Sequence, residues 1–252
     1  QRPKMTRTVA IIQARMGSSR LPGKVKLPLK GKHVLERVLE RITEAENVDD
    51  VVVATSTGRQ DDIIEKILAD KVSVHRGSEE DVLGRMFEAA EKSDADTIVR
   101  ITGDCPLLSP KTLDKVVEKL HKEDADYAAN ILERTFPRGF DVEAFTFSSF
   151  QTVEENSGQE HHREHVTPLY RESNQFKTVN VESKEVFDDE KLIDRADLRL
   201  TLDEADDYML LRKIFEELDE EELLDEKEII REVEKENLHK INKDIEQKEV
   251  SD

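Results

Sequence analysis

Positive charge is concentrated in Gln13–Lys24, a loop that follows the first apolar segment of the chain. Arg15, Arg20 and Lys24 supply the charge, and an arginine can bind phosphate through two parallel hydrogen bonds. Small residues at positions 17–19 allow backbone N–H groups to approach an anion. The loop lacks the Gly-Lys-Ser/Thr ending of a Walker loop. It predicts a phosphate-binding loop of another kind, and an ordinary basic surface loop is the alternative.

A carboxylate that suits a metal ion follows a later apolar segment, in Thr102–Pro106. A tight glycine turn can present Asp104 as a hard oxygen ligand for magnesium. On its own, such an aspartate is more often a turn former or a helix cap. Because the basic loop occurs in the same chain, we favour a metal ligand over a turn former or a helix cap as the role of Asp104. Cys105, the single cysteine, is expected to pack in the core beside this turn.

Five motifs stand in the order of one enzyme family. They are the basic loop, Thr102–Leu107, Phe136–Glu143, Arg163–Thr167 and Leu200–Asp203. Through them the chain resembles the cytidylyltransferases that make CMP-activated sialic-acid-like and Kdo-like sugars, above all the spore-coat polysaccharide biosynthesis branch. The resemblance runs from about residue 8 to residue 215. It implies a single-sheet α/β fold, CTP as donor, magnesium as cofactor and a homodimer.

The resemblance assigns nucleotide-binding roles to several positions. Arg15 matches the family arginine at the triphosphate, and Lys24 matches the catalytic lysine. Five further residues match positions around the phosphates or in the nucleotide pocket: Ser18, Arg20, Thr55, Arg76 and Asp81.

Two aspartates match the family's metal site. Asp104 matches the metal-binding aspartate, and Asp203 matches a second aspartate near the metal in the Kdo branch. Around Asp203 the sequence departs from the usual form by adding Glu204, Asp206 and Asp207. These extra carboxylates make Asp203 the less secure of the two assignments.

Acceptor recognition is expected from two later motifs, through Arg138, Asp141, Glu143, Arg163 and His165. A buried ion pair is the alternative role for the first three. The histidine-rich segment also raises a zinc site, because residues four apart share a helix face. Its candidate ligands are Glu160, His161, His162, Glu164 and His165. We favour a cation-rich helix that meets an anionic acceptor or a partner subunit.

Strands and helices alternate through the first half of the chain. Apolar β-branched runs predict strands at Thr8–Gln13, Val51–Thr55, Val72–His75 and Thr97–Ile101. Amphipathic patterns predict helices at His33–Glu44, Asp61–Leu68, Glu79–Ala90 and about Pro110–His121. This alternation predicts an α/β fold, a mostly parallel sheet with helices on both faces, like that of nucleotide-diphospho-sugar transferases. The loops after the strands should gather at one rim, where ligands bind.

The second half departs from this alternation. After a strand at Ala125–Asn130, residues 131–182 are predicted to leave the sheet as an inserted sub-domain, a lid or a dimer arm. Within it we predict a loop or hairpin at Thr135–Val142, helices at Phe147–Glu154 and Glu160–Arg171, and a strand at Phe176–Val181. Its aromatic residues exceed what so small a unit can bury alone, which favours an isologous homodimer.

The remainder is predicted to return to the sheet. It should form a strand at Asp197–Thr201 and helix from Glu204 to about Glu246, with residues 240–252 as a frayed tail. Residues 5–252 then make a single nucleotidyltransferase domain, and Gln1–Lys4 are left out of the fold prediction.

The composition of the chain limits the kinds of partner and the location that we expect for it. The formal net charge of −19 disfavours nucleic acid and membrane surfaces. One cysteine excludes an internal disulfide. No apolar run approaches the ~18 residues of a membrane span, and no signal-peptide core is visible. A cytoplasmic location is expected.

Together these features predict a magnesium-dependent nucleotidyltransferase. It would transfer CMP from CTP to an acidic sugar-like acceptor, release pyrophosphate, and serve cell-surface polysaccharide or glycoconjugate synthesis. A nucleotide-sugar-dependent glycosyltransferase of similar fold is the main alternative, although such enzymes are expected to carry a DxD-type pair where this chain has Asp104-Cys105-Pro106. A non-catalytic coat or regulatory protein is the third possibility.

Overall fold

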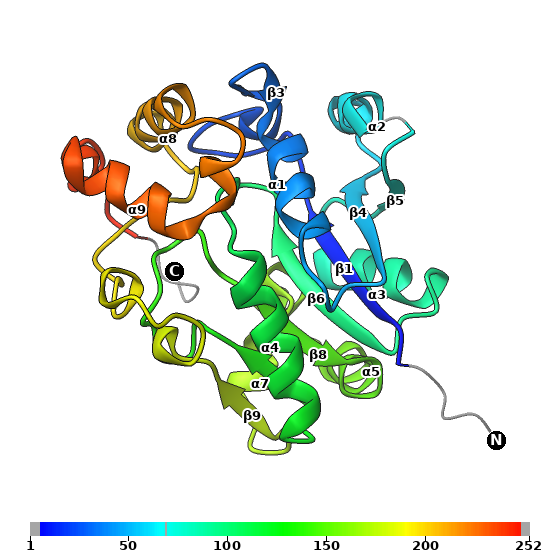
Figure 1. Ribbon diagram of the computed structural model, residues 1–252. Helices are drawn as coiled ribbons and strands as arrows, with labels where there is room; N and C mark the ends of the chain where they lie inside the picture. Colours follow the sequence, from blue (N-terminus) through cyan, green and yellow to red (C-terminus); the bar gives the residue numbers. More distant parts are fainter. Residues whose placement is uncertain (1–5, 69, 248–252) are drawn as a thin grey trace.

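The computed structural model describes residues 6–68 and 70–247, and within these ranges seven strands form the main sheet (Figure 1). Their spatial order is β5 (Ser73–Gly77), β4 (Asp50–Ser56), β1 (Thr8–Gln13), β6 (Thr97–Thr102), β8 (Glu143–Thr146), β7 (Tyr127–Ala129) and β9 (Thr178–Asn180). The first four run parallel, β8 is antiparallel to both of its neighbours, and β9 is parallel to β7. A small hairpin of β2 (Pro28–Leu29) and β3 (Lys32–His33) stands apart. The predicted fold class is confirmed.

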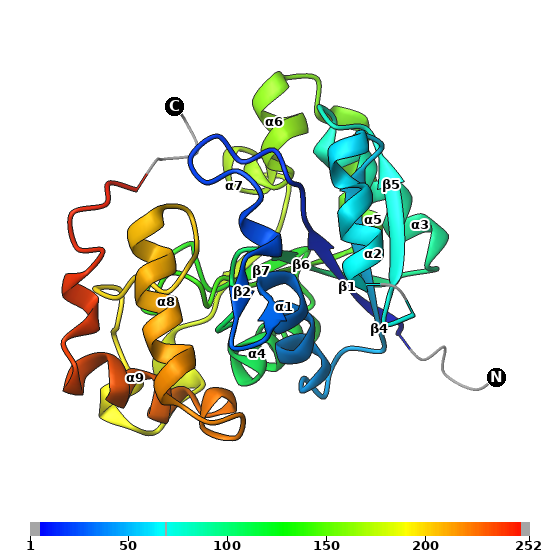
Figure 2. The ribbon, with the colours of Figure 1, turned by 90° about the horizontal axis from the view of Figure 1, so that it is seen from above.

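Two hydrophobic cores form because successive side chains on a strand face opposite sides of the sheet. On β1, Ala10 and Ile12 belong to one core, and Val9 and Ile11 belong to the other. Helices of the first core are α1 (Val34–Thr43), α2 (Asp62–Leu68), α4 (Pro110–Lys122), α8 (Ala205–Glu217) and α9 (Glu226–Lys235). The other face carries α3 (Val82–Lys92), α5 (Phe147–Asn156), α6 (Glu160–His165) and α7 (Pro168–Glu172). Figure 2 shows α6 and α7 across the sheet from α1 and α4.

Short 3-10 helices complete the chain. They are η1 (Lys24–Lys26), η2 (Arg59–Asp61), η3 (Ser183–Glu185), η4 (Glu190–Leu192), η5 (Glu222–Leu224) and η6 (Leu238–Lys240). The strands and helices predicted up to residue 122 are all present, and their ends differ from the prediction by at most three residues. The carboxyl ends of β1, β4, β5 and β6 point the same way, so the loops after them do gather at one rim.

The prediction that residues 131–182 leave the sheet is wrong in part. Strand β8, which the sequence patterns missed, inserts between β6 and β7, and β9 extends the same sheet. The helix predicted at Glu160–Arg171 is two helices, α6 and α7. They separate at Val166, which has φ 72°. Pro168 is the first residue of α7, and because proline disfavours a helical conformation in the residue before it, the helix cannot run on from α6 into α7.

The C-terminal third also differs. No strand forms at Asp197–Thr201, where a single bridge joins Arg138 to Arg199. The predicted long helix is broken into α8 and α9 with 3-10 turns between and after them. The expected frayed tail is packed at Asn242, whose side chain is only 3% exposed. Residues 1–5 and 248–252, and with them Gln1–Lys4 and the end of the tail, lie outside the described residues.

The aromatic residues of residues 131–182 are mostly buried within the chain itself. Phe145 packs against Tyr127, Phe150 and Tyr170, and its own ring is fully buried. Phe136 and Phe140 are buried as well. The aromatic content therefore gives no argument for a dimer, and the homodimer remains a prediction from the family resemblance. Within the described ranges no helix combines the length and apolar character that crossing a membrane requires.

One glycine allows a close contact between the loop before β8 and the backbone of Leu200. Gly139 has φ 104°, and a Cβ atom there would lie 2.6 Å from the backbone of Leu200. We expect Gly139→Ala to lower the free energy of unfolding by roughly 1 kcal/mol or more, because both the backbone conformation and the space exclude a side chain. Urea unfolding would measure it. Gly158→Ala, which meets nothing within 4 Å, is the control, and equal midpoints for the two variants would contradict the strain.

An ion pair ties α3 to α6. Asp81 caps α3 by accepting a hydrogen bond from the Gly84 backbone N–H at 2.9 Å, and it also accepts one from Arg163 Nε at 2.8 Å. Burial alone would raise the pKa of Asp81, but the bonds from Arg163 and Gly84 outweigh it and hold that pKa below its usual range.

The stabilisation from a lowered carboxyl pKa is present above the unfolded value of about 3.9 and is lost as the pH falls through the folded value. We therefore expect Asp81→Asn to lower the melting temperature at pH 7, and the deficit to shrink below about pH 4. Melting curves from pH 3 to 8 would test this. Glu118→Gln, which removes an exposed pair with Lys115, should change little at any pH. A deficit for Asp81→Asn that is constant with pH would contradict the ion pair.

Candidate active site at the strand ends

The basic loop after β1 is held at the rim by its own backbone. Gly23 N–H donates to the Met16 carbonyl at 2.9 Å, and Met16 N–H donates to Asp61 Oδ1 at 2.7 Å. Asp61 is fully buried and also accepts a hydrogen bond from Ser56 Oγ at 2.5 Å. The loop is therefore anchored to the end of β4 and to η2, and its cations are placed above the ends of β1 and β6.

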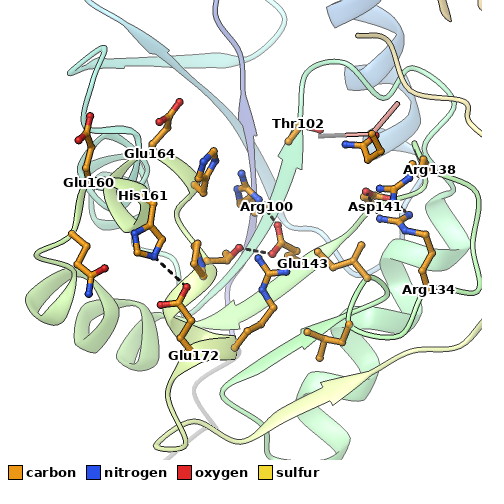
Figure 3. Close-up of a pocket in the computed structure, with 18 residues that line it drawn as sticks. Arg100, Thr102, Arg134, Arg138, Asp141, Glu143, Glu160, His161, Glu164 and Glu172 are labelled. Carbon is orange, nitrogen blue, oxygen red and sulfur yellow. Dashed lines mark hydrogen bonds and ion pairs between the residues drawn. The ribbon is translucent and has the colours of Figure 1, made fainter. Parts of the chain in front are cut away.

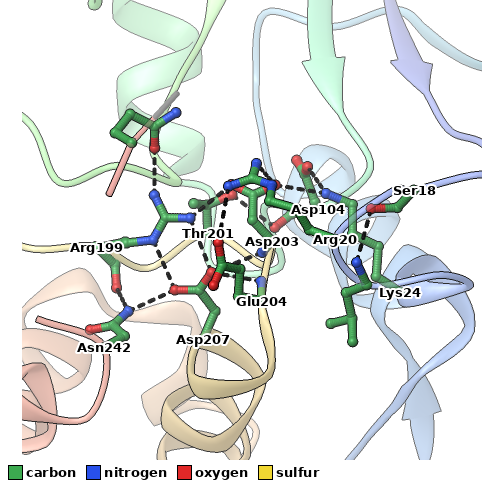
Figure 4. Close-up of polar contacts among 12 residues, drawn as sticks. Ser18, Arg20, Lys24, Asp104, Arg199, Thr201, Asp203, Glu204, Asp207 and Asn242 are labelled. Carbon is green, nitrogen blue, oxygen red and sulfur yellow. Dashed lines mark hydrogen bonds and ion pairs between the residues drawn. The ribbon is translucent and has the colours of Figure 1, made fainter. Parts of the chain in front are cut away.

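Asp104 and Asp203 converge on a single cation in this loop (Figure 4). Lys24 Nζ lies 2.5 Å from Asp104 Oδ2 and 2.9 Å from Asp203 Oδ1. All three side chains are largely buried, with 12%, 19% and 13% of their surfaces exposed for Lys24, Asp104 and Asp203. The structure thus brings together three predicted site residues, although Asp203 follows irregular chain rather than a strand. A bond from the Leu202 N–H to the Asp104 carbonyl, at 2.9 Å, joins the two segments.

Electrostatics keeps Lys24 and Asp104 charged. Burial alone would lower the pKa of Lys24, but Asp104 and Asp203 outweigh it and the pKa is raised. Burial alone would raise the pKa of Asp104, and Lys24 instead holds it below its ordinary value. The neighbouring Cys105 thiol is buried beside Asp104, and both effects raise its pKa well above its ordinary value. Cys105 is therefore a protonated packing residue, as the sequence suggested.

The other residues of the phosphate set lie along the same loop. Arg20 Nη2 is 3.0 Å from Asp203 Oδ1, and its Nη1 is 3.6 Å from Glu204. Ser18 Oγ accepts a hydrogen bond from Leu21 N–H at 3.3 Å and so shapes the turn. Arg15 is half-buried and has no ion pair with residues 6–68 or 70–247. Its charge is available for an anion.

The predicted nucleotide-pocket residues of β4, β5 and α3 lie around the same rim. Thr55 is buried, and its hydroxyl has no hydrogen-bond partner in the described part of the chain. Arg76 is fully engaged: it donates to the carbonyls of Ser56 and Gly58, each at 2.8 Å, and pairs with Asp62 and Glu65 at 2.7 and 2.8 Å. Asp81 is paired with Arg163. These contacts assign Arg76 and Asp81 to holding the rim loops, and a contact with nucleotide remains a prediction for both.

A cavity of about 1220 Å³ reaches Thr102 at the carboxyl end of β6, two residues before Asp104 (Figure 3). Four of the five predicted acceptor residues line it: Arg138, Asp141, Glu143 and His165. Arg163 does not, because it is turned toward Asp81 and Glu154. Sequence analysis missed three arginines of the wall, namely Arg100, Arg134 and Arg171. Arg100 could have been found, since it interrupts an otherwise apolar strand.

Most charges in the cavity wall are paired. Arg134 donates two bonds to Asp141, at 2.6 and 2.9 Å, and Arg100 pairs with Glu143. Burial alone would raise the pKa of Glu143, yet Arg100 and the hydroxyl donors Thr167 and Tyr127 hold it low. Asp141 and Glu143 thus take the ion-pair role that was the alternative for them. They position arginines of the cavity wall, and a contact with an acceptor remains a prediction for both.

Arg138 differs from Arg100 and Arg134, which are paired in the wall. Its backbone pairs with residues 198 and 200, through bonds of 3.0 and 2.7 Å. Its guanidinium group forms no ion pair with the described residues. Burial and the charge of nearby Arg134 lower the pKa of Arg138, so the group would gain from an anion.

The histidine cluster is arranged differently from the zinc site considered above. His161 Nε2 lies 3.2 Å from Glu172 Oε1, and His162 Nε2 lies 2.7 Å from Glu172 Oε2. These are the only three His, Cys, Asp or Glu side chains in residues 6–68 and 70–247 whose ligand atoms all lie within 4.8 Å of one another. His165, four residues after His161, takes no part and lines the cavity instead. The pair of contacts ties α6 to α7, and a zinc ion remains untested.

Comparisons with known proteins identify the family of this chain. A cytidylyltransferase family model matches residues 9–249. The chain is 38% identical over 213 residues to an uncharacterized protein of Methanocaldococcus jannaschii, and the matched residues make up 84% of this chain and 84% of that protein. It is 32% identical over 217 residues to the spore coat polysaccharide biosynthesis protein SpsF of Bacillus subtilis, covering 83% of this chain and 87% of SpsF.

Solved structures give the same picture. A cytidylyltransferase from Leptospira borgpetersenii superposes with a TM-score of 0.85 at 32% identity, over 97% of this chain and 100% of that one. A CMP:2-keto-3-deoxy-manno-octonic acid synthetase complexed with CTP shares the fold at a TM-score of 0.55 and 21% identity, over 70% of this chain and 90% of that one. The family model and the identity to relatives along most of their length establish that this chain belongs to the cytidylyltransferase family.

Proposed function

We propose that the protein transfers CMP from CTP to an acidic sugar-like acceptor, with magnesium as cofactor, and releases pyrophosphate. The observation that carries the proposal is the meeting of Asp104 and Asp203 on Lys24 of the basic loop, in a protein that also has an arginine-lined cavity reaching the end of β6. Two relatives support a sugar-linked product: the spore coat polysaccharide biosynthesis protein SpsF, and the 3-deoxy-manno-octulosonate cytidylyltransferase of Escherichia coli, which is 31% identical over 121 residues. A homodimer and a cytoplasmic location remain predictions.

The two aspartates fit a magnesium ion. They are close enough to share one ammonium group, and magnesium is commonly held by one or two carboxylates together with substrate phosphates. When bound, the ion would neutralise phosphate charge and acidify the acceptor hydroxyl. Asp104 and Asp203 would hold it, and Lys24 would then be free to turn toward the phosphates.

The remaining residues of the rim would stabilise the transition state. The acceptor hydroxyl attacks the α-phosphorus of CTP, the bond to the β-phosphate oxygen breaks, and pyrophosphate leaves. Arg15, Arg20 and Lys24 lie in one loop and would offset the charge that grows on the leaving group. Arg138, half-buried and without an acidic partner among the described residues, would bind the acidic group of the acceptor.

Pyrophosphate release tests the reaction. With magnesium and a panel of acidic sugars, we expect release from CTP that depends on the acceptor and exceeds the release from ATP, GTP or UTP. The cationic loop suits the pyrophosphate that any of these triphosphates would release, and the preference for CTP is expected from the cytidylyltransferase family. A coupled phosphate assay after pyrophosphatase treatment would measure it, with Asp104→Asn as the inactive control. Transfer of sugar from a nucleotide sugar, without pyrophosphate, would instead favour a glycosyltransferase.

The shared metal site predicts losses that do not add. Asp104→Asn should abolish most turnover, because an amide is a poor ligand for a hard cation. Asp203→Asn should also be severe, and the double variant should be little worse than Asp104→Asn alone. Turnover at several magnesium concentrations would measure this, with folding checked by circular dichroism. Fully multiplicative losses would mean that the carboxylates act independently.

A further inference from the structure

The carboxylate of Asp203 is held from both sides (Figure 4). Oδ1 faces the cations of the basic loop, at 2.9 Å from Lys24 Nζ and 3.0 Å from Arg20 Nη2. Oδ2 accepts a hydrogen bond from Arg199 Nη2 at 2.8 Å. A carboxylate fixed in this way has one oxygen committed to the protein, and it turns the other toward the place where a metal ion would bind.

Arg199 is itself immobilised by a buried acid. It donates from Nε to Asp207 Oδ1 at 2.9 Å and from Nη2 to Asp207 Oδ2 at 3.0 Å. Asp207 is fully buried and accepts backbone N–H bonds from Asp203 and Glu204, at 2.9 and 3.0 Å. Asp207 therefore fixes both the guanidinium that holds Asp203 and the backbone of Asp203 itself.

The C-terminal segment closes this arrangement. Asn242 Nδ2 donates to the Arg199 carbonyl at 3.0 Å and to Asp207 Oδ1 at 2.8 Å. The Asn242 side chain is only 3% exposed, so these bonds form away from water. A residue from the end of the chain thus supports a carboxylate at the rim of the sheet.

The charge of Asp207 explains how Arg199 can lie beside Asp203 without removing the attraction of Asp203 for a cation. Arg199 alone would cancel the charge of Asp203 and weaken its attraction for a cation. Asp207 offsets the guanidinium charge, so that Asp203 keeps a net negative charge for the metal site. Asp207 is consequently not a spare ligand, because it already accepts hydrogen bonds from Arg199 and from the two backbone N–H groups.

We propose that Arg199, Asp207 and Asn242 are positioning residues that orient Asp203 for the divalent cation. This inference rests on the proposed function, which makes Asp203 a metal ligand. Residues that form a hydrogen bond with a metal ligand, without binding the metal themselves, typically contribute 10–100-fold to metal affinity or activity. The same magnitude is expected here.

Manganese binding tests the proposal without relying on turnover. The full chain is mixed with CTP and Mn²⁺, and the loss of the electron paramagnetic resonance signal of free Mn²⁺ beyond the loss that CTP alone causes gives the dissociation constant. Arg199→Met should raise that constant by roughly 10–100-fold, and should raise the magnesium concentration for half-maximal turnover to a similar extent. Arg199→Lys, which can replace one of the hydrogen bonds, should recover part of the affinity. Asn242→Ala should shift the constant less, in the same direction.

Arg195→Met is the matched control. Arg195 lies four residues upstream and also pairs with two carboxylates, Asp197 and Glu234, but it contacts neither metal-site aspartate. It should bind Mn²⁺ like the unmodified protein, even if its melting temperature falls. If Arg199→Met does not fold, the Mn²⁺ dissociation constants of Arg199→Lys and Asn242→Ala still test the proposal.

Two results would overturn the proposal, and they differ in what else they overturn. If Asp203→Asn loses Mn²⁺ affinity while the Arg199 and Asn242 variants bind normally, the positioning role is wrong and the metal site stands. If Asp203→Asn itself binds Mn²⁺ normally, the metal role of Asp203 in the proposed function fails, and the positioning role fails with it.

Discussion

The repulsion between two largely buried carboxylates is the constraint around which this site is built. Asp104 and Asp203 lie on segments almost a hundred residues apart in the sequence, and without a cation between them their proximity would cost free energy. The Lys24 ammonium supplies that cation. The ion pairs tie the basic loop, the end of β6 and the segment before α8 into one unit.

Positioning the second aspartate requires parts of the chain that carry no chemistry of their own. Asp203 is not at the end of a strand, so no sheet hydrogen bonds hold its backbone. Asp207 supplies the missing bonds from the first turn of α8, and Asn242 completes them from near the end of the described chain. The C-terminal third thus does more than cover one face of the sheet.

The cavity depends on the antiparallel part of the sheet. Strand β8 pairs with β6 and places Glu143 opposite Arg100, so that an ion pair forms across the two strands. The loop before β8 runs alongside residues 198–200, which brings Arg138 near Asp203. One wall of the cavity and the segment that leads to Asp203 are therefore supported by the same backbone contact, the one that Gly139 makes possible.

Local sequence determined a large part of this protein. The alternation of strand and helix to residue 122, the basic loop and Asp104 at the end of β6 could all be read from it, because strand periodicity and turn residues are local properties. The assignment of Asp203 came from the family resemblance, because the periodicity of the sequence does not identify it.

Only the tertiary structure decided which charged groups face one another. Strand β8 was missed, and Asp197–Thr201 was mistaken for a strand, because hydrogen-bond partners distant in sequence decide whether an extended segment joins a sheet. For the same reason Glu143, Arg76 and Arg163 proved to hold ion pairs, and Arg199, Asp207 and Asn242 acquired a role that none of them shows in sequence: their side chains meet only in the folded chain.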